Sequence, residues 1–108
     1  MKKVSLKLSS AQLRAFFLFI EVGTPLIPKK GLMGNFMHGE LFKIFLKLQQ
    51  KIYLIKDSNS FSLSLAECLA IQQMQFYKVE NMMKDNYSYE LLVYRTILLN
   101  IDEQTVSL

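Results

Sequence analysis

The stretch Val4-Ser-Leu-Lys-Leu-Ser-Ser10 decides how this chain begins to fold. Its apolar residues alternate with Ser5 and Lys7, and alternation with a period of two predicts a strand with one buried face. The two serines at its end favour a helix N-cap, and an apolar helical pattern follows over 11–22. We therefore expect a strand that passes directly into a helix.

The same pattern returns once. Phe61-Ser-Leu-Ser-Leu65 follows the turn-forming stretch Asp57-Ser-Asn-Ser60 and precedes a helical stretch over 66–83. Each half then continues into a further predicted helix, over 36–56 in the first half and 87–101 in the second. The sequence therefore predicts a mostly helical α+β fold, with two strand-helix-helix halves, a small two-stranded sheet and about four helices.

The length of 108 residues fits a single domain over 1–108, and the repeated pattern suggests an internal duplication with halves 1–56 and 57–108. Each predicted strand needs a partner, because a lone strand leaves its backbone donors and acceptors unpaired. Pairing within the chain would relate the halves by a pseudo-twofold axis, with the helices on one face of the sheet. Pairing across a dimer is the alternative, and the sequence is compatible with both.

Three predicted helices each carry one apolar stripe, in which residues recur every three or four positions. The members are Leu41, Phe45, Leu48, Ile52 and Ile55; Leu65, Leu69, Gln72, Phe76, Val79 and Met83; and Tyr87, Leu91, Tyr94, Leu98 and Ile101. Only the segment 84–86 separates the last two stripes, which suits an antiparallel helical hairpin. Gln72 is the one polar member, and such a residue either fixes the packing register or lies at the edge.

The composition, 51% apolar and 20% charged, is that of an ordinary globular domain. Its single cysteine, Cys68, cannot form an intramolecular disulfide, so a reducing compartment and cytoplasmic location are expected. The apolar run over 15–20 lies between Arg14 and Glu21 and is much shorter than the roughly 20 residues of a membrane span. We therefore expect neither an export signal nor a membrane segment.

The net charge changes sign along the chain. Residues 1–56 hold ten basic and two acidic residues, a net charge of +8, whereas residues 57–108 hold three basic and seven acidic residues, a net charge of −4. A molecule polarised in this way can meet an acidic partner, or another copy of itself, through one end.

The segment 23–39 contains all four glycines and both prolines, so irregular backbone is concentrated there. Its apolar and basic residues form a candidate partner loop: Leu26, Ile27, Lys29, Lys30, Leu32 and Met33. Apolar side chains on a basic loop either cover the core or bind a partner, and both interpretations stay open.

Two helix faces are further candidates. Lys43, Lys47 and Lys51 recur every four residues opposite an apolar stripe, as a ridge that either contacts nucleic-acid phosphates, with Lys29 and Lys30 extending it, or simply solvates the helix. No motif for reading bases accompanies the ridge. The tyrosines around the last helix form a candidate interface, or else pack in the core: Tyr87, Tyr89 and Tyr94.

Signals of catalysis are weak. His38 is the only histidine and has no evident orienting partner, so a loop or helix-cap role is expected. Cys68 is expected to be a small apolar core residue, and no glycine-rich phosphate loop follows a strand. We therefore predict no enzyme activity, no cofactor, no metal and no small-molecule substrate.

These observations favour a small non-catalytic protein-interaction or regulatory module that self-associates, as a homodimer, or binds another protein. The alternative is a basic nucleic-acid-associated accessory protein that uses the lysine ridge.

Overall fold

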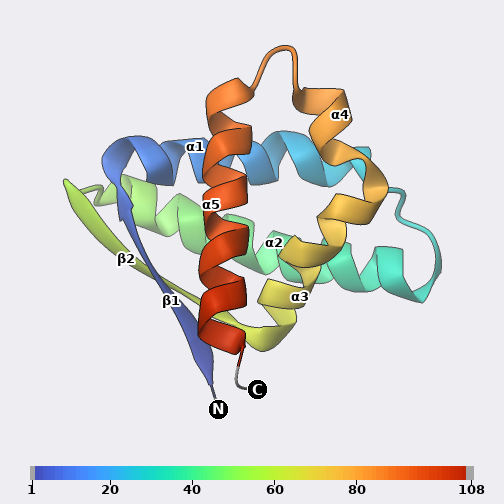
Figure 1. The fold of residues 1–108 in the computed structure, drawn as a ribbon, viewed down its shortest axis with the longest axis horizontal. Helices are drawn as coiled ribbons and strands as arrows, with labels where there is room; N and C mark the ends of the chain where they lie inside the picture. Colours follow the sequence, from blue (N-terminus) through green and yellow to red (C-terminus); the bar gives the residue numbers. More distant parts are fainter. Residues whose placement is uncertain (1, 107–108) are drawn as a thin grey trace.

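Two strands pair with each other along one side of the molecule, and helices cover one face of the small sheet they form (Figure 1). The computed structural model describes residues 2–106. In chain order the elements are β1 (Lys3–Ser9), α1 (Ser10–Gly23), the 3-10 turn η1 (Thr24–Leu26), α2 (Gly31–Tyr53), β2 (Ser58–Ser64), α3 (Leu65–Gln73), the 3-10 turn η2 (Met74–Tyr77), α4 (Val79–Met83) and α5 (Ser88–Thr105). The predicted α+β class, mostly helical with two strands, is confirmed.

The strands are antiparallel, and their register runs from the pair Lys3 and Ser64 to the pair Ser9 and Ser58. Every second residue is buried in both strands. The buried face consists of Val4, Leu6, Leu8, Asn59, Phe61 and Leu63. The strands therefore pair within the chain, and the expectation that helices cover one face of the sheet is confirmed.

Both strands pass into a helix through the same capping box. The Ser9 hydroxyl accepts from the Gln12 backbone N–H at 3.1 Å, and the Gln12 side chain accepts from the Ser9 backbone at 2.9 Å. Ser64 and Glu67 make the same two bonds at 3.1 and 2.8 Å. The two capping serines, Ser9 and Ser64, are 55 positions apart. The sequence comparison that matched Val4 with Phe61 used an offset of 57, so the structure aligns the two halves two residues differently.

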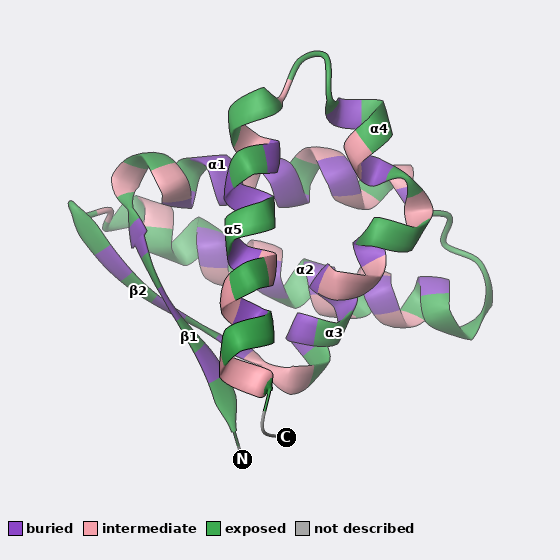
Figure 2. Cartoon of the chain, viewed as in Figure 1, coloured by how far each residue is buried: buried purple, intermediate pink, exposed green. Residues whose placement is uncertain are grey.

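The halves share one core, because α5 packs on α1 while α2 packs on α3. Tyr94 of α5 joins both halves: its ring stacks on Phe19 of α1 at 4.2 Å, and its hydroxyl donates to the Ile71 carbonyl of α3 at 2.9 Å. In Figure 2, buried and exposed residues alternate along the ribbon of α5, as expected for a helix with one face in the core. Every member that spacing predicted for the apolar faces of α2 and α5 is buried or half-buried, although Ile55 lies after the end of α2 and Tyr87 before the start of α5.

The prediction of one continuous helix over 66–83 is wrong. The chain leaves the helical path after Gln73, and Lys78 adopts the left-handed conformation with φ of 58° before α4 begins. The predicted stripe of this segment is also wrong, because Leu69 and Phe76 are 41% and 75% exposed. The cap at Ser64 starts the helix one residue earlier than expected, and α3 buries a different face: Glu67, Cys68, Ala70 and Ile71.

The second helix begins at Gly31, five residues before the predicted start, and ends at Tyr53. Gly31 has a φ of 74°, which a side chain would disfavour. A Cβ on Gly34 would lie 2.5 Å from the Pro28 carbonyl oxygen, so the connection packs directly against the helix. These two glycines allow the chain to turn tightly into α2.

Candidate functional site

The candidate partner loop divides into three parts. Ile27 is buried and Leu26 is half-buried, so these two residues cover the core, whereas Lys29 and Lys30 are exposed. The last two members, Leu32 and Met33, lie in the first turn of α2 and are not loop residues. The long irregular linker expected here is therefore reduced to a short connection over 27–30.

His38 fastens this connection to the helix. Its ring nitrogen Nε2 lies 2.7 Å from the Ile27 carbonyl oxygen, and because a carbonyl only accepts, Nε2 donates the proton. The histidine thus holds a loop in place from within α2, whereas a position in a loop or at a helix cap was expected.

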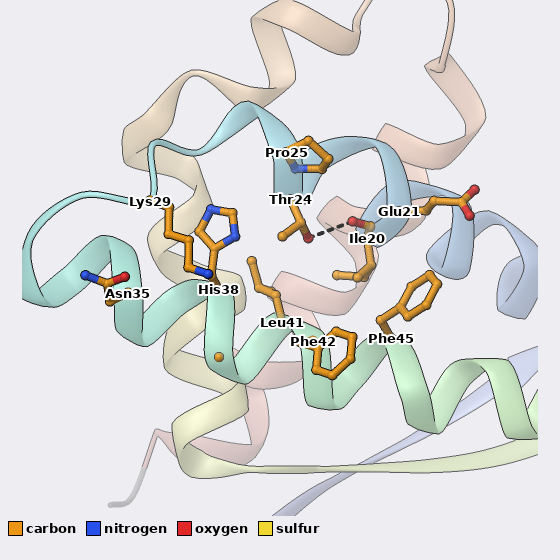
Figure 3. A pocket seen from close by; sticks show the side chains of 11 residues that line it. Ile20, Glu21, Thr24, Pro25, Lys29, Asn35, His38, Leu41, Phe42 and Phe45 are labelled. Atoms are coloured by element: carbon orange, nitrogen blue, oxygen red, sulfur yellow. Dashed lines mark hydrogen bonds between the residues drawn. The ribbon is translucent and has the colours of Figure 1, made fainter.

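An apolar groove of about 690 Å³ lies between the end of α1, η1 and the first half of α2 (Figure 3). Its apolar side chains include Ile20, Leu41, Phe42 and Phe45, and Figure 3 shows Phe42 and Phe45 side by side along α2. Polar residues also line it: Glu21, Thr24, Lys29, Asn35 and His38. Spacing along the sequence does not reveal this apolar groove, because its two sides come from helices separated by the linker.

The lysine ridge is not a row of equivalent free charges. Lys43 pairs with Glu40 at 3.0 Å on its own helix. Lys47 turns toward the second half, where its ammonium donates to Glu67 at 2.7 Å and to the Ser62 carbonyl at 2.9 Å. Within residues 2–106, Lys51 is the ridge member without an ion pair.

The Lys47 side chain is oriented toward Glu67 because the buried Glu67 carboxylate requires a compensating positive charge. The Glu67 side chain is only 5% exposed, and its carboxylate already accepts from the Ser64 backbone in the capping box. A buried carboxylate left unpaired is strongly destabilising, so Lys47 compensates it. The Lys47 ammonium also lies 5.3 Å from the centre of the Phe61 ring.

The side chains of Lys47 and Gln104 bond to backbone groups on the two outer edges of the sheet, at strand positions that face each other. The Gln104 amide accepts from the Ser5 backbone N–H at 3.0 Å and donates to the Ser5 carbonyl at 2.8 Å. Ser5 and Ser62 are partners in the strand register, and the Ser62 carbonyl accepts from Lys47. Side chains thus occupy edge groups that would otherwise be free to pair with another strand.

A second hollow, of about 890 Å³, brings Lys7 together with three lysines that are about 40 to 50 positions further along the chain. We call it the lysine groove; it is lined by Lys7 of β1, Lys47 and Lys51 of α2, and Lys56 of the α2–β2 connection. The remaining lining residues are Ser5, Leu6, Gln50, Leu54, Ser58, Asn59, Ser60, Phe61 and Ser62. No acidic residue belongs to this lining, and helix spacing alone could not have revealed it.

The candidate tyrosine interface is wrong for Tyr94, which is fully buried. Burial, assisted by the nearby Glu80 carboxylate, raises the pKa of the Tyr94 phenol well above its ordinary value. Tyr87 is half-buried, and Tyr89 is exposed at the start of α5. Tyrosine content therefore did not distinguish core from surface.

Two helix surfaces carry exposed apolar side chains instead. The α2 stripe consists of Leu32, Phe42 and Leu46, and the α5 stripe consists of Tyr89, Leu92 and Leu99. Leu32, Phe42, Leu92 and Leu99 are each more than half exposed. The α2 stripe borders the apolar groove through Phe42.

The single cysteine is shielded from solvent. Cys68 is buried, and burial together with the Glu67 carboxylate raises the pKa of its thiol to about 11. A thiol with such a pKa is protonated at neutral pH and is a weak nucleophile. In the part of the chain that the structure describes, no three His, Cys, Asp or Glu residues are grouped to hold a metal ion.

Within residues 2–106, no helix combines the length and the apolar character that crossing a membrane requires. A comparison of the chain with protein-family models, with curated proteins and with solved structures gives no match. The function is therefore argued from the two grooves, the two stripes and their charges.

Proposed function

We propose that this protein is a non-catalytic interaction module that self-associates, with the α2 stripe of one copy packed against the α5 stripe of another. The observation that carries the proposal is the exposure of large apolar side chains on two helices, since contiguous exposed apolar surface is typical of interaction sites. The shielded Cys68 supports a non-catalytic role.

The charges of the two helices favour α2 against α5 over either helix against itself. Residues 31–53 contain three lysines and one glutamate, a net charge of +2, and residues 88–105 contain one arginine and three acidic residues, a net charge of −2. Pairing α2 with α2, or α5 with α5, would bring like charges together, whereas α2 against α5 is complementary.

The apolar groove lies beside the α2 stripe and could receive side chains of a neighbouring copy. Its lining is mainly apolar, and Phe42 belongs to both surfaces. Leucines from a neighbouring α5, such as Leu92 and Leu99, suit a hollow of this kind, because interface cores are built from apolar anchors in pockets. The second copy is therefore the occupant that we propose for the groove.

Light scattering coupled to gel filtration tests this proposal. The expected mass is at least twice the 12.6 kDa of one chain, and it should rise with protein concentration. Phe42→Glu and Leu92→Glu should each return the protein to a monomer, whereas Asn86→Glu, at an exposed site outside both stripes, should not. A monomer at high concentration would overturn the proposal.

Charge reversal tests the orientation. Lys43→Glu with Lys51→Glu on α2 should weaken association, and so should a matched reversal of Asp102 and Glu103 to Lys on α5. Mixing the two reversed proteins should restore association between them, because each helix of one protein then meets a helix of opposite charge on the other. A single chain with both reversals should also associate again, because the complementarity is rebuilt. If the doubly reversed chain stays monomeric while the unaltered one associates, the α2-to-α5 arrangement is wrong.

We further propose a cytoplasmic location, which the reduced, buried Cys68 supports. The second candidate function, a nucleic-acid-associated accessory protein, is favoured by the four lysines of the lysine groove.

A further inference from the structure

We infer that the lysine groove binds the phosphate backbone of single-stranded nucleic acid. The inference gives the second candidate function a specific site and ligand. It does not depend on self-association, because the lysine groove shares no lining residue with the apolar groove or with either stripe.

The free positive charge of the groove comes from three elements. Lys7, Lys51 and Lys56 lie on β1, on α2 and between α2 and β2. None of the three takes part in an ion pair within residues 2–106, whereas the charge of Lys47 is compensated by Glu67. Three uncompensated ammonium groups around one hollow, with no carboxylate in its lining, create a site for several neighbouring negative charges.

Neutral hydrogen-bonding groups accompany these lysines. Ser58, Ser60 and Ser62 are every second residue of β2, they are exposed, and all three line the groove. Most protein contacts to nucleic acid go to phosphate and sugar, from lysines and from hydroxyl groups of this kind. A chain of phosphates therefore matches the lining better than a single anion would.

The end of α2 favours a single strand over a duplex. Leu54 lines the groove and is 78% exposed, and Tyr53, which precedes it in the chain and lies outside the lining, is 85% exposed. Unpaired bases of a single strand can stack on an exposed aromatic ring, whereas the bases of a duplex are already stacked on one another. The lining contains no arginine for bidentate reading of guanine, so contacts would be to the backbone and largely independent of sequence.

Fluorescence anisotropy of a labelled oligothymidine, titrated with the protein at several salt concentrations, tests the inference. Three phosphate contacts predict that the logarithm of the binding constant falls with the logarithm of salt concentration with a slope of about −2, since each contact to a single strand contributes about −0.7. Lys7→Gln, Lys51→Gln and Lys56→Gln should each reduce this slope by about 0.7.

Matched controls separate the groove from general charge. Lys84→Gln removes an exposed lysine outside the groove and should leave the slope unchanged. Tyr53→Ala should weaken binding at every salt concentration without changing the slope, because stacking releases no counterions. The mass of each variant, measured by light scattering, shows independently whether self-association is retained.

Four outcomes would overturn the inference. They are absence of binding at low salt, loss of binding with Lys84→Gln equal to that with Lys51→Gln, equal binding of a polyglutamate peptide of the same charge, and tighter binding of a duplex than of the single strand. Circular dichroism confirms that each variant is folded.

Discussion

The two halves of the molecule begin in the same way and end differently. In each, an alternating strand passes through a Ser-based capping box into a helix, yet α1 continues for 14 residues while α3 stops after nine. The spacing of 55 positions that relates the caps also relates buried residues of the two halves. Leu13, Phe16 and Phe19 correspond in this alignment to Cys68, Ile71 and Met74, and all six are buried. A shared start thus fixes which face is buried, whereas helix length depends on residues further along each half.

At the related positions 16 and 71 the first half buries the larger side chain, and truncating this side chain gives the largest expected effect. Phe16→Ala should lower the free energy of unfolding by about 3–5 kcal/mol, because it leaves a cavity and removes an edge-to-face contact with Phe61 at 5.9 Å. Ile71→Ala, at the related position, should cost less, toward the lower part of the range of about 2–5 kcal/mol for such truncations. Urea denaturation measures both, and a larger loss for Ile71→Ala would reverse the comparison.

Removing the side chains that bond to the sheet edges should give smaller losses of stability, and the two losses should differ because Lys47 is charged and Gln104 is neutral. Lys47→Met leaves the Glu67 carboxylate buried without a cation, and after allowing for a Lys47 side chain that is 41% exposed we expect a loss of about 1–3 kcal/mol. Gln104→Ala should cost about 0.5–1 kcal/mol, since its edge of the sheet can bond to water instead.

A second substitution isolates the cause of the Lys47 effect. Glu67→Gln in the Lys47→Met background should recover part of the lost stability, as measured by thermal denaturation, because a neutral amide tolerates burial better than a carboxylate. No recovery would mean that the Ser62 carbonyl, and not Glu67, is the contact that matters.

Alkaline pH should destabilise the protein through the second half. The residue of the first half that corresponds to Cys68 is Leu13, which cannot ionise. In the second half, burial raises the pKa of the Cys68 thiol from 9.0 to about 11. The unfolded chain then loses this proton before the folded one does, so the contribution is complete below pH 9 and is lost as the pH rises toward 11. The melting temperature of Cys68→Ala should therefore decline less steeply than that of the unaltered protein over this window; parallel declines would contradict the assignment.

Local signals predicted much of the fold. Alternation identified β1 and β2, and a serine cap predicted the start of α1 to within one residue, whereas the start of α3 was predicted one residue late. The buried faces of α2 and α5 were recognised from spacing. The break at Lys78 was not predicted, since a lysine carries no preference for a left-handed conformation. The early start of α2 was missed because glycines were interpreted as loop residues, although Gly34 is required by the approach of Pro28.

The candidate surfaces were harder to predict than the fold, because they depend on contacts between distant residues. Helix spacing grouped Lys47 with Lys43 and Lys51, but its orientation is determined by Glu67, 20 positions away. Lys7 joins Lys51 and Lys56 only through the pairing of β1 with β2. Tyr94 was placed at an interface by its residue type, yet its hydroxyl finds a partner in the core at the Ile71 carbonyl.

The bond between Gln104 and Ser5 joins residues 99 positions apart, and this separation matters while the protein is being synthesised. Chains emerge from the ribosome from the N-terminus onward, so β1 appears first and waits for both β2 and the end of α5. During that interval its edge is open to other nascent chains. The alternating Lys3 and Lys7 on this strand therefore have a second use, since charged side chains on an unpaired strand oppose aggregation until the last helix arrives.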